Sequence, residues 1–205
     1  MPKDVRVSTL LGDHGLSVNS SWFTEESRER GQLVHWLGEH VLKGIEVSCA
    51  PSMSGYLEAL RKGAEVLSWS SLLSECRMTS GFVTGRPDSL GLVRKRAGSI
   101  PAGPAILDIK SGEPYDSHGV QLALYELLAR ETGKIEQVFG AASVPVSRIG
   151  LYVKSDGKYH VKLYDDSTDR IAAAALVNIT RWRAAHGMLP DQPPIEDPQQ
   201  DEELL

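Results

Sequence analysis

The sequence is poor in cysteine, with only Cys49 and Cys76 among its 205 residues. Two cysteines so far apart cannot form a Cys-x-x-Cys metal knuckle, and they are too few for a four-thiolate iron–sulfur site. We interpret both as ordinary apolar positions that a cytosol keeps reduced, and we expect no iron–sulfur cluster.

Long hydrophobic runs are also missing. The sequence has no stretch of about eighteen apolar residues, which is the length that a membrane-spanning helix needs. The segment from Met1 to Ser20 lacks the basic and then apolar pattern of a secretion signal. We therefore expect no membrane span, no membrane partner and a cytoplasmic location.

Positive charge is in the minority, with 22 Lys and Arg against 27 Asp and Glu and a formal net charge of −5. Six of the acids, and no base, lie in the last sixteen residues, "PDQPPIEDPQQDEELL". Without them, residues 1–189 carry 22 bases against 21 acids. We predict one domain over residues 1–189, followed by an acidic tail at 190–205 whose prolines and lack of apolar periodicity favour disorder.

Apolar spacing predicts alternating helical and extended segments. Thr24 is the expected N-cap of the first helix, ahead of the acids Glu25 and Glu26. The spacing predicts helices over 24–44, from 54 to about 69, over 117–133 and over about 167–186; it predicts three strands between 72 and 110 and a hairpin over 147–164 with an Asp-Gly turn. This order predicts an α/β (α+β) fold in which helices flank a central mixed sheet.

The first predicted helix carries an unusual histidine. His35 lies four residues after Gly31 and three before Gly38, so all three share one side of the helix. Glycine costs roughly 1 kcal/mol against alanine inside a helix. We therefore expect another part of the chain to pack closely against both glycines.

Two charged side chains end the apolar run "AILDIK". Successive strand residues point to opposite faces, so Asp108 and Lys110 share one face while Ile109 points into the core. Asp88 lies in "GRPD" about twenty residues earlier, in a predicted returning strand that also holds Gly85. A hairpin followed by an adjacent strand can bring the two aspartates side by side, where they repel unless a cation lies between them. Carboxylate oxygens suit Mg²⁺ or Mn²⁺, and an imidazole ligand favours Mn²⁺.

Three polar residues share a face of the helix in "SHGVQLALYELLARETG". Gln121 and Tyr125 are four residues apart, and His118 lies three before Gln121. His118 has two open interpretations, contact with a phosphate or capping of the helix start. The polar residues of this helix join His35, Asp88, Asp108 and Lys110 in one candidate site, formed by polar side chains near the ends of predicted helices and strands.

The ordered motifs "RGQLVHWLGEH", "GRPD", "LDIKSG", "HGVQLALY" and "KSDGKYHVKLY" resemble those of the PD-(D/E)XK, or restriction-endonuclease-like, nuclease superfamily, in its RecB-type and phage-exonuclease branch. The resemblance covers residues from about 25 to 186. It implies a restriction-endonuclease-like core and a deoxyribonuclease dependent on Mg²⁺ or Mn²⁺. The residues that it assigns are the metal ligands His35, Asp88, Asp108 and the main-chain carbonyl of Ile109, the catalytic Lys110, the DNA-positioning Gln121 and Tyr125, and, on a looser match within its strand, the catalytic Glu75.

Several basic residues are further candidates for contact with DNA. Arg94, Lys95 and Arg96 lie in the loop between the two carboxylate-bearing strands, and Arg86 neighbours Asp88. Each also has the ordinary alternative of a solvated charge or a structural ion pair.

The resemblance implies an exonuclease that acts on linear double-stranded DNA ends in recombination or repair, in a bacterial or phage-infected cytosol. Three alternatives stay open: an endonuclease, a single-strand-specific nuclease with the same site, and a non-cleaving module that binds DNA or protein on the same fold. The resemblance suggests a single-strand annealing protein as a partner. A homo-oligomer that forms a ring around DNA would explain processive digestion by a nearly neutral domain.

Overall fold

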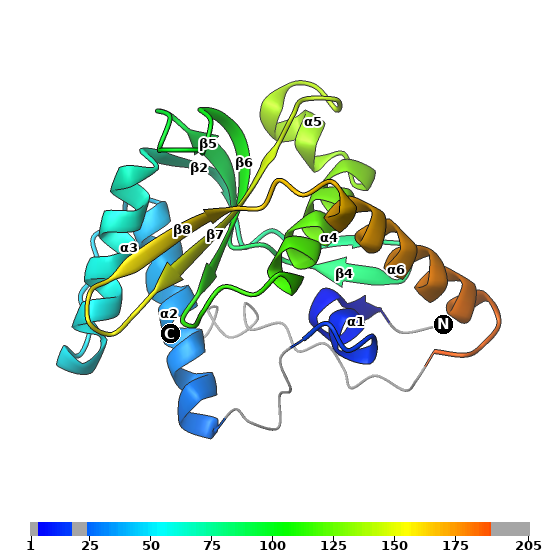
Figure 1. The fold of residues 1–205 in the computed structure, drawn as a ribbon, viewed down its shortest axis with the longest axis horizontal. Helices are drawn as coiled ribbons and strands as arrows, with labels where there is room; N and C mark the ends of the chain where they lie inside the picture. Colours follow the sequence, from blue (N-terminus) through cyan, green and yellow to red (C-terminus); the bar gives the residue numbers. More distant parts are fainter. Residues whose placement is uncertain (1–3, 18–23, 190–205) are drawn as a thin grey trace, which may run out of the picture.

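The computed structural model describes residues 4–17 and 24–189, so the acidic tail at 190–205 lies outside the described residues. A mixed five-stranded sheet forms the centre (Figure 1). Its strands follow the spatial order β2 (Trp69–Ser74), β5 (Ser89–Val93), β6 (Gly103–Lys110), β7 (Ser147–Val153) and β8 (Tyr159–Leu163). Only β6 and β7 run parallel; the other neighbours are antiparallel.

A second, three-stranded sheet lies beside the first. Its order is β1 (Val5–Arg6), β4 (Val83–Gly85) and β3 (Met78–Ser80), and it is also mixed because β1 and β4 are parallel. The helical elements are α1 (Val7–Asp13), α2 (Glu25–Leu42), the short 3-10 helix η2 (Pro51–Met53), α3 (Ser54–Val66), α4 (Ser117–Glu131), α5 (Lys134–Phe139) and α6 (Thr168–Ala185). Within the described ranges, no helix is both long and apolar enough to cross a membrane.

The predicted fold class is confirmed: helices flank a central mixed sheet. Thr24 caps α2, since its side-chain oxygen accepts a hydrogen bond from the Ser27 amide at 3.2 Å. Gly157 turns the β7–β8 hairpin with a φ of +78°. The second sheet, α1 and α5 were not predicted, because their segments are short and carry little periodicity.

One predicted strand is wrong in detail. The expected returning strand with Gly85 and Asp88 is divided into β4 and β5, which belong to different sheets. Residues 86–88 leave one sheet and enter the other, so Asp88 lies just ahead of β5 rather than within a strand. Proline at position 87 has no amide proton to donate, and this suits a point where strand pairing stops.

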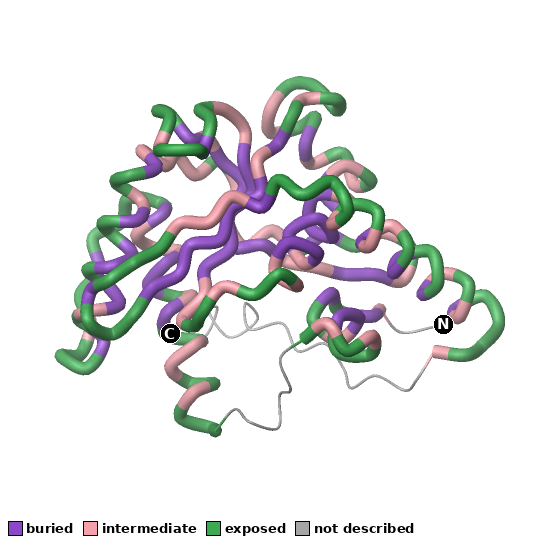
Figure 2. Tube along the Cα trace, in the orientation of Figure 1, coloured by how far each residue is buried: buried purple, intermediate pink, exposed green. Residues whose placement is uncertain are grey.

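Two apolar clusters cover the two faces of the large sheet. Figure 2 shows that most of the central strands are buried. On one face, Leu107 and Ile109 of β6 pack with α2 and α3. On the other, Ile106 packs with α4, α6 and the small sheet. Burial of each of these aliphatic side chains stabilises the fold by about 1.5–3 kcal/mol. Because side chains alternate along β6, Asp108 and Lys110 point to the same face as Ile106, which is the face covered by α4.

The close packing expected at both glycines of α2 occurs at only one. A Cβ atom on Gly38 would lie 2.2 Å from Cδ1 of Ile109, so the glycine lets α2 approach β6. A Cβ on Gly31 would meet no described atom within 4 Å. The prediction is correct for Gly38 and wrong for Gly31, which lies about two turns nearer the start of the helix.

Candidate active site

The register of two antiparallel strands brings the predicted aspartates to one end of the large sheet. Ser89 at the start of β5 pairs with Leu107 near the end of β6. Asp88, one residue before Ser89, and Asp108, one residue after Leu107, are the next pair in this antiparallel register and therefore lie next to each other. Both carboxylates are buried, each 4% exposed.

Asp88 is held from two elements. One carboxylate oxygen lies 2.7 Å from Nδ1 of His35 on α2, and the other accepts the amide hydrogen of Ile109 in β6 at 2.5 Å. The side chain thus ties α2 to the sheet through its two oxygens. Ile109 was predicted to act through its carbonyl; its observed contact with the site is through its amide.

Asp108 and Lys110 share one strand face, as predicted, and form an ion pair. Nζ of Lys110 lies 2.6 Å from Oδ2 of Asp108, and the lysine side chain is 21% exposed. The ammonium group of Lys110 therefore lies in the site, while part of the lysine side chain is exposed to solvent.

Glu75 and Arg86 extend the site toward β2. Glu75 follows the last residue of β2, and Oε2 lies 2.8 Å from Nε of Arg86. Its amide donates to the carbonyl of Asp88 at 3.1 Å. Glu75 has a φ of +49°, a left-handed conformation that costs about 1–2 kcal/mol in a residue with a Cβ. The structure brings together Glu75, Arg86 and Asp88. The predicted contact of Arg86 with DNA stays a prediction.

Burial and charge perturb these groups strongly. Burial, with the neighbouring Asp88 charge and hydrogen bond, raises the pKa of Glu75 to about 8. Burial also raises the pKa of Asp108 despite the Lys110 charge. Burial acts in the same sense on Asp88, but the His35 charge and hydrogen bonds hold its pKa below the usual value. The Asp88 charge raises the pKa of His35 to about 9.

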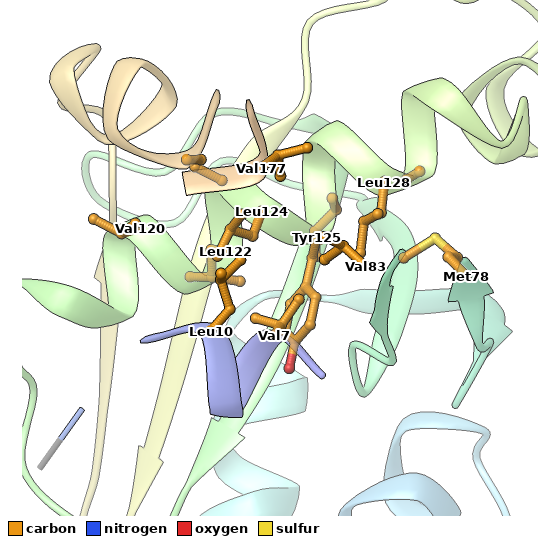
Figure 3. Packing of buried hydrophobic residues seen from close by; sticks show 14 of the residues in the cluster. Val7, Leu10, Met78, Val83, Val120, Leu122, Leu124, Tyr125, Leu128 and Val177 are labelled. Atoms are coloured by element: carbon orange, nitrogen blue, oxygen red, sulfur yellow. The ribbon is translucent and has the colours of Figure 1, made fainter. Parts of the chain in front are cut away.

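Gln121 and Tyr125, the predicted pair on α4, differ in burial: Gln121 is partly exposed and Tyr125 is buried. Nε2 of Gln121 donates to the Tyr125 hydroxyl at 3.0 Å. The ring of Tyr125 is 7% exposed and packs with Val83 and Leu128, while its hydroxyl points away from α4 (Figure 3). Burial and the charges of the site carboxylates raise the pKa of that hydroxyl. A buried ring offers no surface to DNA, so contact with DNA stays a prediction for Gln121 only.

His118 lies in the first turn of α4 and contacts Tyr115 and Tyr152, which in turn contact Tyr164. Nδ1 is 2.7 Å from the Tyr152 hydroxyl, which is 2.5 Å from the Tyr164 hydroxyl; Tyr164 donates to the carbonyl of Tyr115 at 3.0 Å. The sequence analysis missed Tyr152 and Tyr164. Alternation places Tyr152 on a known strand face, but only the pairing of β7 with β6 reveals that this face borders Lys110.

The basic loop after β5 does not belong to the site. Arg94 follows β5 directly, whereas Asp88 precedes it, so the five residues of the strand lie between them and their Cα atoms are about 20 Å apart. Arg94 donates to the Ser70 hydroxyl and Arg96 to the carbonyl of Gly98, each at 3.0 Å. The loop joins the ends of β5 and β6 opposite to the carboxylates, so contact of Arg94, Lys95 and Arg96 with DNA stays a prediction for a surface away from the site.

The donor types suit a divalent cation, although the side chains now bond to one another. Among the described residues, no three His, Cys, Asp or Glu side chains are arranged to hold a metal ion jointly. His35 and Ile109 occupy the two oxygens of Asp88. Three buried or half-buried carboxyl groups nevertheless lie together here, and burial, followed by the nearby Asp88 charge, raises the pKa values of Glu75 and Asp108. The residues fit a hard cation that would replace the His35–Asp88 bond.

Comparisons with protein-family models and with curated proteins give no match. Among solved structures, the chain is similar to a protein from Eubacterium rectale described as a "putative exonuclease", at 13% sequence identity and a TM-score of 0.45. The match covers 100% of this chain and 90% of that one. At this identity and TM-score the likeness does not identify an activity.

Proposed function

We propose that the protein is a metal-dependent deoxyribonuclease that hydrolyses phosphodiester bonds. The observation that carries the proposal is the convergence of four residues at one end of the sheet: His35 from α2, Asp88 from the link ahead of β5, and Asp108 and Lys110 from β6. The residues come from sequence positions 35 to 110, and two of them are buried carboxylates. The resemblance of the motifs to those of PD-(D/E)XK nucleases supports the same chemistry.

His35, Asp88 and Asp108, with the carbonyl of Ile109, would hold Mg²⁺ or Mn²⁺. When bound, such an ion supplies Lewis acidity to a phosphoryl oxygen and lowers the pKa of bound water. The chain itself supplies Lys110, whose ammonium group, held by Asp108 at 2.6 Å, stabilises the negative charge that develops on the phosphate. Burial excludes water around Asp88 and Asp108 and so strengthens these interactions.

Glu75 and Gln121 have supporting roles in this proposal. Glu75 lies beside Asp88 and forms an ion pair with Arg86, so its carboxyl group contributes to the electrostatic potential at the site. Gln121 lies on α4 beside the same sheet face and offers an amide for a phosphate or sugar oxygen. The preferred substrate is a linear DNA duplex that is digested from its ends, as the motif resemblance suggests; a homo-oligomer around DNA and a single-strand annealing partner belong to this proposal.

The test is digestion of one DNA molecule in linear and in closed-circular form, with Mg²⁺, with Mn²⁺ and with a chelator. We expect loss of the linear form alone, only with metal. Lys110→Ala should lower the rate at least 100-fold, because it removes charge stabilisation from the transition state. Lys62→Ala is the matched control, since Lys62 pairs with Glu58 on the exposed side of α3.

Each alternative has its own outcome. Cleavage of both DNA forms would establish an endonuclease, and cleavage of single strands alone a single-strand-specific enzyme. If a folded wild type cuts no DNA with either metal, the nuclease proposal fails and a binding module takes its place. Equal rates for wild type and folded Lys110→Ala would also contradict it.

A further inference from the structure

The outer side of α6 is apolar, and the rest of the described chain leaves it uncovered. Helix α6 packs against α4 and lies outside it (Figure 1). Its inner side, with Ala173, Leu176 and Val177, is buried in the core. On its outer side Ile171 is 69% exposed and Trp182 is 49% exposed. A helix that is apolar on both sides is typical of one that is covered on both sides.

One row of residues runs along this outer side. Positions three or four apart lie on the same side of a helix, and the row follows this spacing. It consists of Ile171, Ala174, Asn178, Trp182 and Ala185, which we call the outer row. All five are at least partly exposed, and none is charged. The outer row therefore lacks the basic side chains with which proteins bind DNA phosphates.

Two arginines beside the outer row are paired within their own chain. Arg170 forms an ion pair with Glu126 at 2.9 Å, and Arg181 forms one with Glu131 at 2.6 Å. Because these acids balance the two positive charges, the arginines do not repel a second copy of the same surface. An uncharged apolar row with balanced edges suits a partner that carries the same kind of surface.

The sizes of the side chains make the outer row complementary to itself. Asn178 is its centre, Ala174 and Trp182 lie four residues to either side, and Ile171 and Ala185 lie seven to either side. If a second copy packs antiparallel across a two-fold axis at Asn178, Trp182 meets Ala174 and Ile171 meets Ala185. Each large side chain then faces a small one, as close packing requires. In a parallel pair each residue would face its own copy, so the two tryptophans would collide and the alanines would leave gaps.

The polar centre of the outer row supports the same arrangement. At the two-fold axis Asn178 faces its own copy, and an amide side chain carries both donors and an acceptor. Two facing asparagines can therefore bond to each other. At any other register the amide would be buried against an apolar side chain, which costs free energy. A single asparagine between paired helices fixes register in this way.

The area available agrees with a weak dimer. Helix α6 has 18 residues and is about 27 Å long. Trp182, which stacks on His186 with ring centroids 4.4 Å apart and is thus already held in place, offers roughly 100 Å². With Ile171, Ile179, Met188 and the alanines, the outer side offers roughly 500 Å² per copy, or about 1,000 Å² in a dimer. This is near the lower limit for a specific interface, so we expect a micromolar dissociation constant.

We infer that two copies of this chain associate through an antiparallel α6–α6 contact on a two-fold axis at Asn178. The contact uses the same surface on both copies, so it closes after two of them. The inference deepens the homo-oligomer of the proposed function and rests on that proposal in this respect alone. Its tests need neither DNA nor metal, so it and the nuclease proposal can fail separately.

The first test is sedimentation equilibrium of the full-length protein between about 1 and 200 μM, where a micromolar dimer dissociates measurably. We expect a monomer–dimer equilibrium. Ile171→Lys would place an unpaired ammonium group against Ala185, and it should weaken the dimer roughly 30-fold or more. Leu33→Lys is the matched control, because Leu33 is a 49% exposed leucine on α2, and it should leave the equilibrium unchanged. Urea unfolding checks that both variants are folded.

Three results of this experiment would overturn the inference. They are a monomer at every concentration, a trimer or larger assembly, and a dimer that Ile171→Lys does not weaken. If a dimer forms only after residues 190–205 are removed, the acidic tail and not a second copy is the occupant of the outer row in the full-length protein.

The second test probes the two-fold axis directly. Two thiols that face each other across the axis are close enough to form a disulfide. Mild oxidation should therefore give a covalent dimer of Asn178→Cys on a non-reducing gel. The wild type, in which Cys49 and Cys76 are partly buried, and Glu65→Cys, at an exposed position of α3, should stay monomeric on the same gel. A dimer in solution whose Asn178→Cys variant does not cross-link would place the contact elsewhere and contradict the inference.

Discussion

At the residue scale, the consequence most open to measurement is the pH dependence contributed by His118. Its pKa falls from the ordinary 6.5 to about 4 in the folded protein, because burial and the Lys110 and Lys162 charges disfavour the imidazolium. Between these two pH values the unfolded chain binds more protons than the folded one. The stability due to the neutral ring is therefore complete above about pH 6.5 and is lost as the pH falls toward 4.

We predict that His118→Gln flattens this part of the stability curve. One proton corresponds to at most about 1.4 kcal/mol per pH unit, and partial exposure of the ring reduces this figure. Urea unfolding of wild type and variant at pH 7 and pH 4.5 measures the difference between the two slopes. Equal slopes for both proteins would show that His118 does not titrate in this window.

At the element scale, α2 carries His35 to the site, and its two glycines provide a matched pair. A Cβ on Gly31 would meet open space among the described residues, so Gly31→Ala should raise the free energy of unfolding by about 0.5–1 kcal/mol through helix propensity. Gly38→Ala would place a Cβ 2.2 Å from Ile109 Cδ1 and should lower it by about 1–3 kcal/mol. Urea unfolding compares the two, and a stabilising Gly38→Ala would show that the helix shifts at little cost.

A buried ionic cluster joins α4, β7 and α6. Arg148 is 1% exposed; it lies 3.2 Å from Asp169, donates to the carbonyl of Asp166 at 2.7 Å and lies 3.9 Å from the buried Glu126. Arg148→Met removes the cation beside Asp169, although Glu126 keeps Arg130 and Arg170, and should cost about 3–5 kcal/mol. Arg170→Met is the control, because that side chain is 48% exposed and its pair with Glu126 should contribute less than about 1 kcal/mol. Thermal or urea unfolding tests the contrast, and similar losses for both would contradict it.

At the scale of the whole molecule, the distribution of charge bears on DNA binding. Residues 190–205 contribute six acids, so a chain that ends at Leu189 changes from −5 to +1 in formal charge. We predict that this truncation tightens DNA binding several-fold at low salt, because long-range repulsion is removed. Fluorescence anisotropy with chelator present at 50 and 200 mM salt measures the effect, which should shrink at the higher salt. An effect that does not depend on salt would indicate a direct contact of the tail instead.

Local sequence patterns were sufficient to predict most of the helices and strands and to identify which residues belong to the candidate site. Strand alternation placed Asp108 and Lys110 on one face, and the Thr24 cap and helical spacing located α2. These features depend on residues close in sequence, whose geometry is fixed by the 3.6 and 2 residue periods. The pairing of Asp88 with Asp108 also followed, because an antiparallel hairpin constrains its own register.

Only the tertiary structure decided what depends on distant pairing. The parallel register of β6 and β7 brings Tyr152 beside Lys110, and no local signal specifies it because the connecting chain is long. The same structure moves Arg94 to the far end of the sheet, buries the ring of Tyr125 and leaves open space at Gly31. The sequence by itself determined which chemical groups the site contains; long-range packing decided which of them are neighbours, since burial and register come from contacts between segments far apart in the chain.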